Sequence, residues 1–192
     1  MAPTRERLLQ AAQELIEEGG YGAASVAQVA ERAGVAAGTL YRHFESKQEL
    51  FVEVFRSVCA HEARAMRAAA DAIENGSAVE RLEEVLATFA KRALRNPRLA
   101  WALLAEPVDP LVDAERLEYR QRYAGLIAEG LRAGIDSGEL PPQDVELTAA
   151  ALVGGCGEAL VGPLSPLAGP RAPVPEILDA LQTFARRAVG AR

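Results

Sequence analysis

Five polar side chains between Thr39 and Lys47 have the types and spacing needed to contact a charged polymer. They are Thr39, Tyr41, Arg42, His43 and Lys47. The two hydroxyls and the ring N–H can donate hydrogen bonds, and the arginine and the lysine supply cations. Near the start of a helix, such groups can bind phosphates and the edges of bases. If they lie on one exposed face, they form a surface suited to nucleic acid.

A helix that ends in a glycine turn is predicted just before these residues. Ser25 precedes a series of apolar residues at helical spacing, and Gln28 lies three residues after it, which is the pattern of a capping box. The apolar series is Val26, Val29, Ala30 and Ala33. Gly34 follows this series and can adopt the left-handed conformation that ends a helix. The sequence therefore predicts a helix that starts at Ser25 and a turn at Gly34.

A second helix is predicted over residues 36–44, with Leu40 and Phe44 one turn apart on its inner side. Two short helices joined by a glycine-containing turn are typical of a helix-turn-helix, whose second helix enters the DNA major groove. An ordinary helical hairpin with a solvated polar face would show the same spacing. The spacing alone leaves both interpretations open.

The motif around these helices resembles a known family. The run AGVAAGTLYRHFESKQEL, preceded by SVAQVA and by a helix ending in GGYGAAS, resembles the DNA-binding domain of TetR-family transcriptional repressors. The resemblance covers about the first 60 residues, and the rest matches only in helical layout.

The resemblance implies roles for individual residues. Residues equivalent to Thr39, Tyr41 and Arg42 face the groove in that family, and those equivalent to Ser25, His43 and Lys47 usually contact the phosphate backbone. Three alanines, Ala27, Ala36 and Ala37, stand where relatives often carry longer polar or basic side chains. Direct base readout is therefore expected to rest on few residues, with the Ala37 methyl available to a thymine methyl.

The whole chain reads as an all-α protein of about nine helices, with no strand predicted. The first helix is expected from Thr4 to Gly19, and the fourth from Ser46 to about Glu74. A helix of that length spans roughly 40 Å at 1.5 Å per residue and can join a head to a body. We expect a DNA-binding head at residues 1–62, with its motif at about 25–44, and a ligand-binding and dimerisation domain at residues 63–192.

Composition sets limits on location and partners. The chain has a net charge of −6, but residues 1–47 hold five basic and six acidic side chains, so most of the excess negative charge lies outside the predicted head. Non-specific affinity for DNA should be modest, because it depends on phosphate neutralisation. Two cysteines fit a reducing compartment, and neither a signal peptide nor an uncharged membrane span is evident. A cytoplasmic location without membrane contact is expected.

The last two predicted helices suggest a homodimer. The segment LTAAALVGGCGEALVGPL has few charges and many small residues, which let helix backbones approach closely. The resemblance implies a four-helix interface between two copies, although these helices could instead be the core of a monomer. In a dimer, two recognition helices roughly 34 Å apart would read a palindromic operator.

A small-molecule pocket is the second expectation for the body. The resemblance implies a cavity within helices four to eight whose occupant moves helix four and releases DNA. The candidate lining residues combine apolar walls with a few polar tips. They are Phe89, Trp101, Leu104, Tyr119, Tyr123 and Cys156. As alternatives, the tryptophan and the phenylalanine could be plain core, and the two tyrosines a solvated helix face.

Enzymatic chemistry has little support in the sequence. Cys156 lies far along the chain from the only histidines, His43 and His61, and no strand precedes it to build a nucleophile elbow. No metal site and no cofactor are predicted. The sequence thus indicates a DNA-binding regulator, most simply a repressor released by a small molecule, and the alternative is a helical protein-interaction module that does not bind DNA. The effector, the operator and the regulated genes are not specified.

Overall fold

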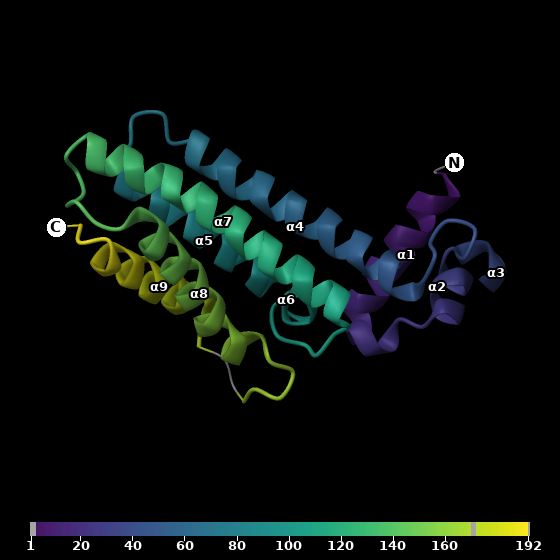
Figure 1. The fold of residues 1–192 in the computed structure, drawn as a ribbon. Helices are drawn as coiled ribbons and strands as arrows, with labels where there is room; N and C mark the ends of the chain where they lie inside the picture. Colours follow the sequence, from purple (N-terminus) through teal and green to yellow (C-terminus); the bar gives the residue numbers. More distant parts are fainter. Residues whose placement is uncertain (1–2, 170–171, 192) are drawn as a thin grey trace.

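The computed structural model describes residues 3–169 and 172–191 and forms an elongated bundle with a smaller head at one end (Figure 1). Across these residues the chain forms nine α-helices and one short 3-10 helix, and no strand. The predicted all-α fold is confirmed.

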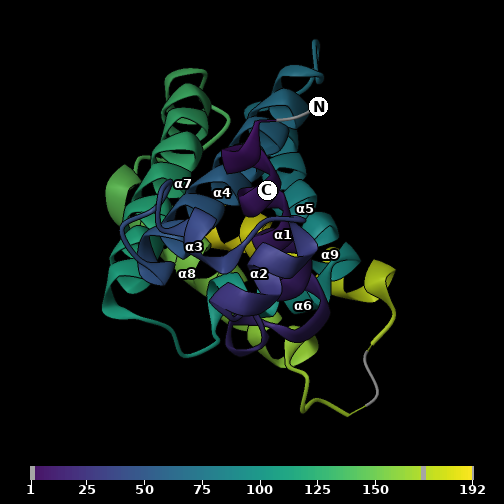
Figure 2. The ribbon, with the colours of Figure 1, turned by 90° about the vertical axis from the view of Figure 1, so that its right-hand side faces the viewer.

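The head consists of three helices and a short 3-10 turn. These are α1 (Thr4–Gly19), η1 (Tyr21–Ala23), α2 (Val26–Arg32) and α3 (Ala37–Leu40). Their inner faces meet the start of α4 in a core that includes Leu8, Ala12, Leu15, Val29, Leu40, Phe44, Phe51 and Phe55. Figure 2 shows these helices from the head end of the molecule.

Local sequence signals explain how α2 begins and ends. Ser25 and Gln28 form both halves of the capping box, as predicted. Gly34 has φ +65°, the left-handed conformation expected of it. The Arg7 guanidinium from α1 donates hydrogen bonds to the carbonyls of Ala33 and Gly34. The turn between α2 and α3 is therefore held by the first helix.

The helix predicted over residues 36–44 is shorter in the structure, where α3 covers only Ala37–Leu40. Beyond Leu40 the backbone continues as a tight turn, because the N–H groups of Arg42 and His43 bond to carbonyls three residues earlier. The Phe44 side chain is buried, which draws the chain into the core directly after this turn. The polar residues 41–43 therefore lie on a turn rather than on a regular helix.

The body contains the remaining six helices. They are α4 (Lys47–Asp71), α5 (Ala78–Arg95), α6 (Pro97–Leu104), α7 (Pro110–Asp136), α8 (Val145–Leu164) and α9 (Val174–Ala188). Helices α4, α5 and α7 pack on one another along the length of the molecule, α8 packs on α7, and α9 packs on α5 (Figure 1). Ser46 caps α4, which is three residues shorter at its end than predicted. Helix α4 runs from the head into the body and belongs to both.

Helix α8 is long and apolar enough to be a candidate membrane span, although the sequence analysis found no uncharged one. By length and composition alone, it is the one described helix that could cross a membrane, although helices in the cores of soluble proteins can pass the same test. Only 28% of its most apolar window is buried within the chain. Leu147 on α8 is 69% exposed and Phe184 on α9 is 43% exposed. The two last helices thus carry an apolar surface that a single chain leaves uncovered.

Candidate functional site

The polar residues of α3 and its following turn are presented on the surface of the head. Tyr41, Arg42 and His43 are all exposed, with 57% of Tyr41 accessible. Ala37 is exposed at the start of α3, and Thr39 is half-buried. Because Leu40 is buried, the turn that follows it presents the polar side chains of residues 41–43 to the solvent. A surface that reads bases or binds phosphates needs exposed donors of this kind.

Lys47 occupies the first position of α4 and is held over two aromatic rings. Its Nζ lies 5.4 Å from the centroid of Tyr21 and 5.1 Å from that of Phe51, and the residue is half-buried. These cation–π contacts order a side chain that is otherwise flexible. A cation at a helix N-terminus, where backbone N–H groups also point outward, can bind phosphate.

Ser25 uses its side chain mainly to cap α2. Its hydroxyl donates to Gln28 Oε1 over 2.6 Å and accepts from the Gln28 backbone N–H over 3.3 Å. The backbone N–H of Ser25 also donates to Gln28 Oε1 over 3.0 Å. A phosphate oxygen only accepts hydrogen bonds, so contact with a phosphate would need this hydroxyl to rotate and donate its O–H away from Gln28.

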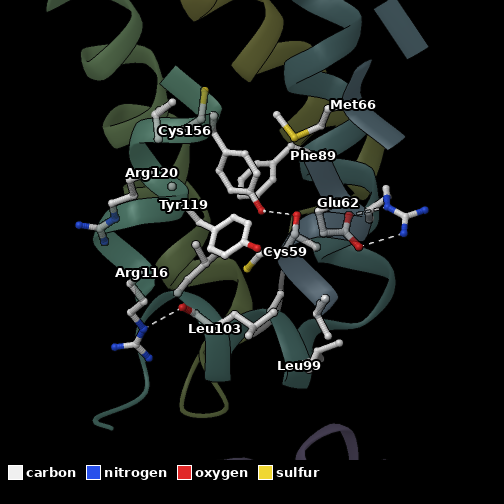
Figure 3. A pocket seen from close by; sticks show the side chains of 18 of the residues that line it. Cys59, Glu62, Met66, Phe89, Leu99, Leu103, Arg116, Tyr119, Arg120 and Cys156 are labelled. Atoms are coloured by element: carbon white, nitrogen blue, oxygen red, sulfur yellow. Dashed lines mark hydrogen bonds and ion pairs between the residues drawn. The ribbon is translucent and has the colours of Figure 1, made fainter. Parts of the chain in front are cut away.

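A cavity of about 1060 Å³ lies between α4, α5, α6, α7 and α8 and reaches α1 (Figure 3). Five of the six residues predicted to line a pocket do line it: Phe89, Leu104, Tyr119, Tyr123 and Cys156. Trp101 is outside the lining. On α6, residues 99, 100, 103 and 104 line the cavity at helical spacing, and Trp101 lies off that face.

Aromatic rings form the centre of the cavity wall and join α7 to α4 and α5. The Tyr123 ring lies 6.0 Å from Phe89 and 6.2 Å from Tyr119. Tyr119 donates its hydroxyl to the Arg56 carbonyl over 3.0 Å, and Tyr123 donates to the Cys59 carbonyl over 3.3 Å. Burial raises the pKa of both tyrosines. Their hydroxyls remain neutral donors anchored on the α4 backbone.

Both cysteines line the cavity as neutral thiols. Burial raises the pKa of Cys59 to about 12 and that of Cys156 to about 11. A thiol at that pKa is protonated at neutral pH and is a poor nucleophile. Cys59 and Cys156 therefore act as small apolar wall residues, consistent with the sequence argument against a catalytic Cys156.

Two of the arginines that line the cavity already bond to other groups of the protein. Arg92 forms two hydrogen bonds with the Glu62 carboxylate, of 2.5 and 2.9 Å. Arg116 donates to the carbonyls of Ala102, Leu103 and Glu106 and so closes the end of α6 (Figure 3). Its guanidinium is a structural clamp.

Three further cations at the edge of the cavity are exposed. They are Arg64 on α4, Arg95 on α5 and Arg120 on α7. An apolar interior with cations at its edge fits a ligand that has a long apolar part and an anionic part. The sequence argument overlooked Arg64 and Arg95.

Several apolar lining residues were also missed by the sequence argument. They are Cys59, Met66, Leu86, Leu99, Leu103 and Ile127. Each lies on an inner helix face, and an inner face that borders a cavity has the same apolar spacing as one that fills the core. No local signal separates the two cases.

Two family profiles match most of the chain. Residues 8–54 match the profile described as bacterial regulatory proteins, tetR family. Residues 75–160 match one described as a tetracyclin repressor-like C-terminal domain. The first match covers the head and the start of α4, and the second covers α5 to most of α8.

Individual relatives and a solved structure agree with these profiles. The transcriptional regulator UidR of Escherichia coli K12 is 28% identical over 141 residues, which are 73% of this chain and 70% of the relative. The transcriptional repressor KstR of Mycolicibacterium smegmatis is 38% identical over 100 residues, 52% of this chain and 48% of the relative. The regulator FadR of Bacillus subtilis, solved with stearoyl-CoA, has a TM-score of 0.78 at 22% identity, covering 94% of this chain and 96% of FadR. At that identity the likeness shows the fold.

Proposed function

Because the chain belongs to the TetR family of bacterial regulatory proteins, we propose that it is a transcriptional repressor. It binds a palindromic operator as a dimer and leaves the operator when a small molecule fills the cavity. The cavity of about 1060 Å³ is the observation that carries the ligand-responsive part, because a core packed only for stability leaves few voids larger than a water molecule. Such a protein acts where the chromosome is, in the cytoplasm.

The DNA surface we propose consists of the exposed α3 turn and the N-terminus of α4. Thr39, Tyr41 and Arg42 face the groove with Ala37 beside them, and Arg42 supplies the one long cation able to bind a guanine edge. Ser25, His43 and Lys47 contact phosphates. The boundary between residues 1–62 and 63–192 stays a prediction, because α4 runs through it.

The dimer we propose forms through α8 and α9. Within one chain one face of α8 is left exposed, and that face carries small residues that permit close helix approach. These are Ala150, Ala151, Gly154, Ala159 and Gly162. The exposed Phe184 lies beside Gly155, where an added Cβ would lie 3.0 Å from its ring. A Phe184→Glu variant should sediment as a monomer at concentrations where the wild type is a dimer.

The ligand class we propose is a long-chain acyl thioester such as an acyl-coenzyme A. An acyl chain suits the aromatic and thiol-lined interior, and phosphates suit the exposed cations Arg64, Arg95 and Arg120 at the edge. FadR of Bacillus subtilis, which shares the fold, was solved with stearoyl-CoA. The cavity of about 1060 Å³ lies at the upper end of the volumes of small-molecule sites, and a long-chain acyl thioester is a large ligand that needs such a volume.

Fluorescence anisotropy of labelled DNA from upstream of its own gene tests the proposal. We expect tight binding to one palindromic fragment, weakening steeply with salt, and release on addition of stearoyl-coenzyme A. No binding to any fragment even at low salt, where phosphate contacts are strongest, would favour a protein-interaction module instead. Release by stearoyl-coenzyme A but not by coenzyme A alone would support the acyl chain as the recognised part.

Two glycines offer a matched pair of variants for the cavity. Gly157 lines the cavity and Gly125 does not, and a Cβ added at either meets no atom within 4 Å. Gly157→Leu should place a side chain in the cavity and weaken the response to stearoyl-coenzyme A roughly tenfold or more, while Gly125→Leu leaves it unchanged. Equal responses in the two variants would place the ligand elsewhere.

A further inference from the structure

The body touches the head at a second place besides α4. At the start of α6, Arg98 Nη2 donates a hydrogen bond of 2.5 Å to the carbonyl of Gly19, the last residue of α1. Just beyond the end of α6, Glu106 Oε2 accepts a 3.1 Å hydrogen bond from the backbone N–H of Tyr21. Arg98 and Glu106 also lie 3.9 Å apart as an ion pair. In Figure 1, α6 lies between the body and the head.

Gly20 lies at the centre of this contact. Its φ of +82° and ψ of −177° belong to a region essentially restricted to glycine. A Cβ at this position would lie 2.2 Å from Arg98 Nη2 and 2.7 Å from Glu106 Oε2. The turn between α1 and η1 thus lets the two charged side chains approach its backbone.

Tyr21 connects this contact to the proposed DNA surface. Its backbone is held by Glu106, while its ring packs on Phe51 with centroids 4.5 Å apart. The same ring lies 5.4 Å beneath Lys47 Nζ. A shift of the Tyr21 backbone would therefore displace the platform that orders Lys47.

The opposite side of α6 borders the cavity. Leu99, Leu103 and Leu104 line it, and the Arg116 clamp ties the end of α6 to α7. Helix α6 is only eight residues long, and the Glu106 N–H bonds to the Trp101 carbonyl at its end, so the cavity face and the two head contacts belong to one short segment.

We propose that Arg98 and Glu106 are positioning residues for DNA binding, which together with Gly20 form a latch that holds Tyr21 and, through it, Lys47. The latch fixes the head relative to the body, so less orientational freedom is lost when both heads of a dimer meet DNA. An occupant of the cavity that moves α6 would act on the head through the latch, a consequence that rests on the proposed function.

The test uses the full chain without ligand and a matched pair of variants. Arg98→Met and Lys91→Met each remove one positive charge, from α6 and from the neighbouring α5, but only Arg98 bonds to the head, whereas the exposed Lys91 pairs with Glu84. We expect Arg98→Met to weaken binding to the upstream DNA fragment at least roughly fivefold, the low end of measured coupling between sites. Lys91→Met should change it less than about twofold, and Arg98→Lys, which keeps a donor, should recover most of the loss. Equal affinities for the two methionine variants would overturn the proposal.

Two further readouts separate positioning from a general loss of stability. In a Lys47→Ala background, Arg98→Met should cost less than it does alone, because both changes act on one contact; full additivity would contradict the latch. Hydrogen exchange of the Tyr21 amide needs no DNA and should be faster in Arg98→Met and in Glu106→Leu than in Lys91→Met. If the wild type binds no fragment, the proposed function fails, and exchange at Tyr21 still decides whether the latch exists: unchanged protection refutes it.

Discussion

Replacing Gly20 with alanine is the sharpest test of how the head is attached. The backbone at Gly20 has φ +82° and ψ −177°, which costs a residue with a side chain on the order of 1–3 kcal/mol. The new Cβ would also lie 2.2 Å from Arg98 Nη2, so this flexible side chain must move and loses its bond to the Gly19 carbonyl. A charged hydrogen bond of this kind contributes about 1.5–3 kcal/mol. The free energy of unfolding of Gly20→Ala should therefore fall by roughly 2.5–6 kcal/mol.

Gly22→Ala is the matched control, because Gly22 lies two residues away with open space where a Cβ would go. It should be neutral, or stabilised by up to about 1 kcal/mol through a less flexible unfolded chain. Urea unfolding followed by circular dichroism measures both variants. At this chain length each 1 kcal/mol corresponds to a shift in Tm of roughly 2–4 °C.

The two contributions can be separated in an Arg98→Ala background. There the clash with Arg98 is absent, while the backbone strain and the approach to Glu106 Oε2 at 2.7 Å persist. Gly20→Ala should therefore cost less than in the wild type, by up to the roughly 1.5–3 kcal/mol of the lost hydrogen bond. A Gly20→Ala protein whose unfolding free energy lies within about 0.5 kcal/mol of wild type would refute both the strain and the close approach of α6.

Further outcomes follow from the site. Lys47→Ala should lower the slope of log affinity against log salt by about one per head, roughly two per dimer, and an unchanged slope would remove Lys47 from the phosphate contacts. Arg42→Ala should instead relax sequence preference, costing about 1–3 kcal/mol at one base pair, which competition with single-base operator variants measures. Burial raises the pKa of Cys59 to about 12, so its thiol stays protonated in the folded chain while an unfolded thiol ionises near pH 9. Stability present below pH 9 should therefore be lost between about pH 9 and 12. Urea unfolding of Cys59→Ala should show a loss smaller by up to about 4 kcal/mol at the end of that range, since each pKa unit corresponds to about 1.4 kcal/mol, and equal losses would contradict the raised pKa.

Local signals in the sequence determined where most helices begin and end. Helix ends can be predicted from spacing alone where the groups that form them lie within a few residues of one another. This holds for the Ser25–Gln28 capping box, the left-handed Gly34 and the N-cap Asp109 before Pro110. The helix predicted over residues 36–44 was wrong in length, because the burial of Phe44 draws the chain inward. Helical spacing had placed Phe44 on the inner side, but no local pattern reports that the regular helix ends at Leu40 before Phe44 enters the core.

The sequence by itself determined the all-α fold and the position of the helix-turn-helix motif, because these follow from helical spacing, capping and a long specific motif. The five cavity residues that it named rested on the family resemblance, because helical spacing does not distinguish a cavity wall from a filled core. Tertiary structure alone decided that Trp101 lies off the cavity, that Lys47 rests on Tyr21, and that Arg98 and Glu106 reach the turn at Gly20. The reason is distance along the chain. Glu106 and Tyr21 are 85 residues apart, and only the packing of α6 against α1 brings them within hydrogen-bonding range.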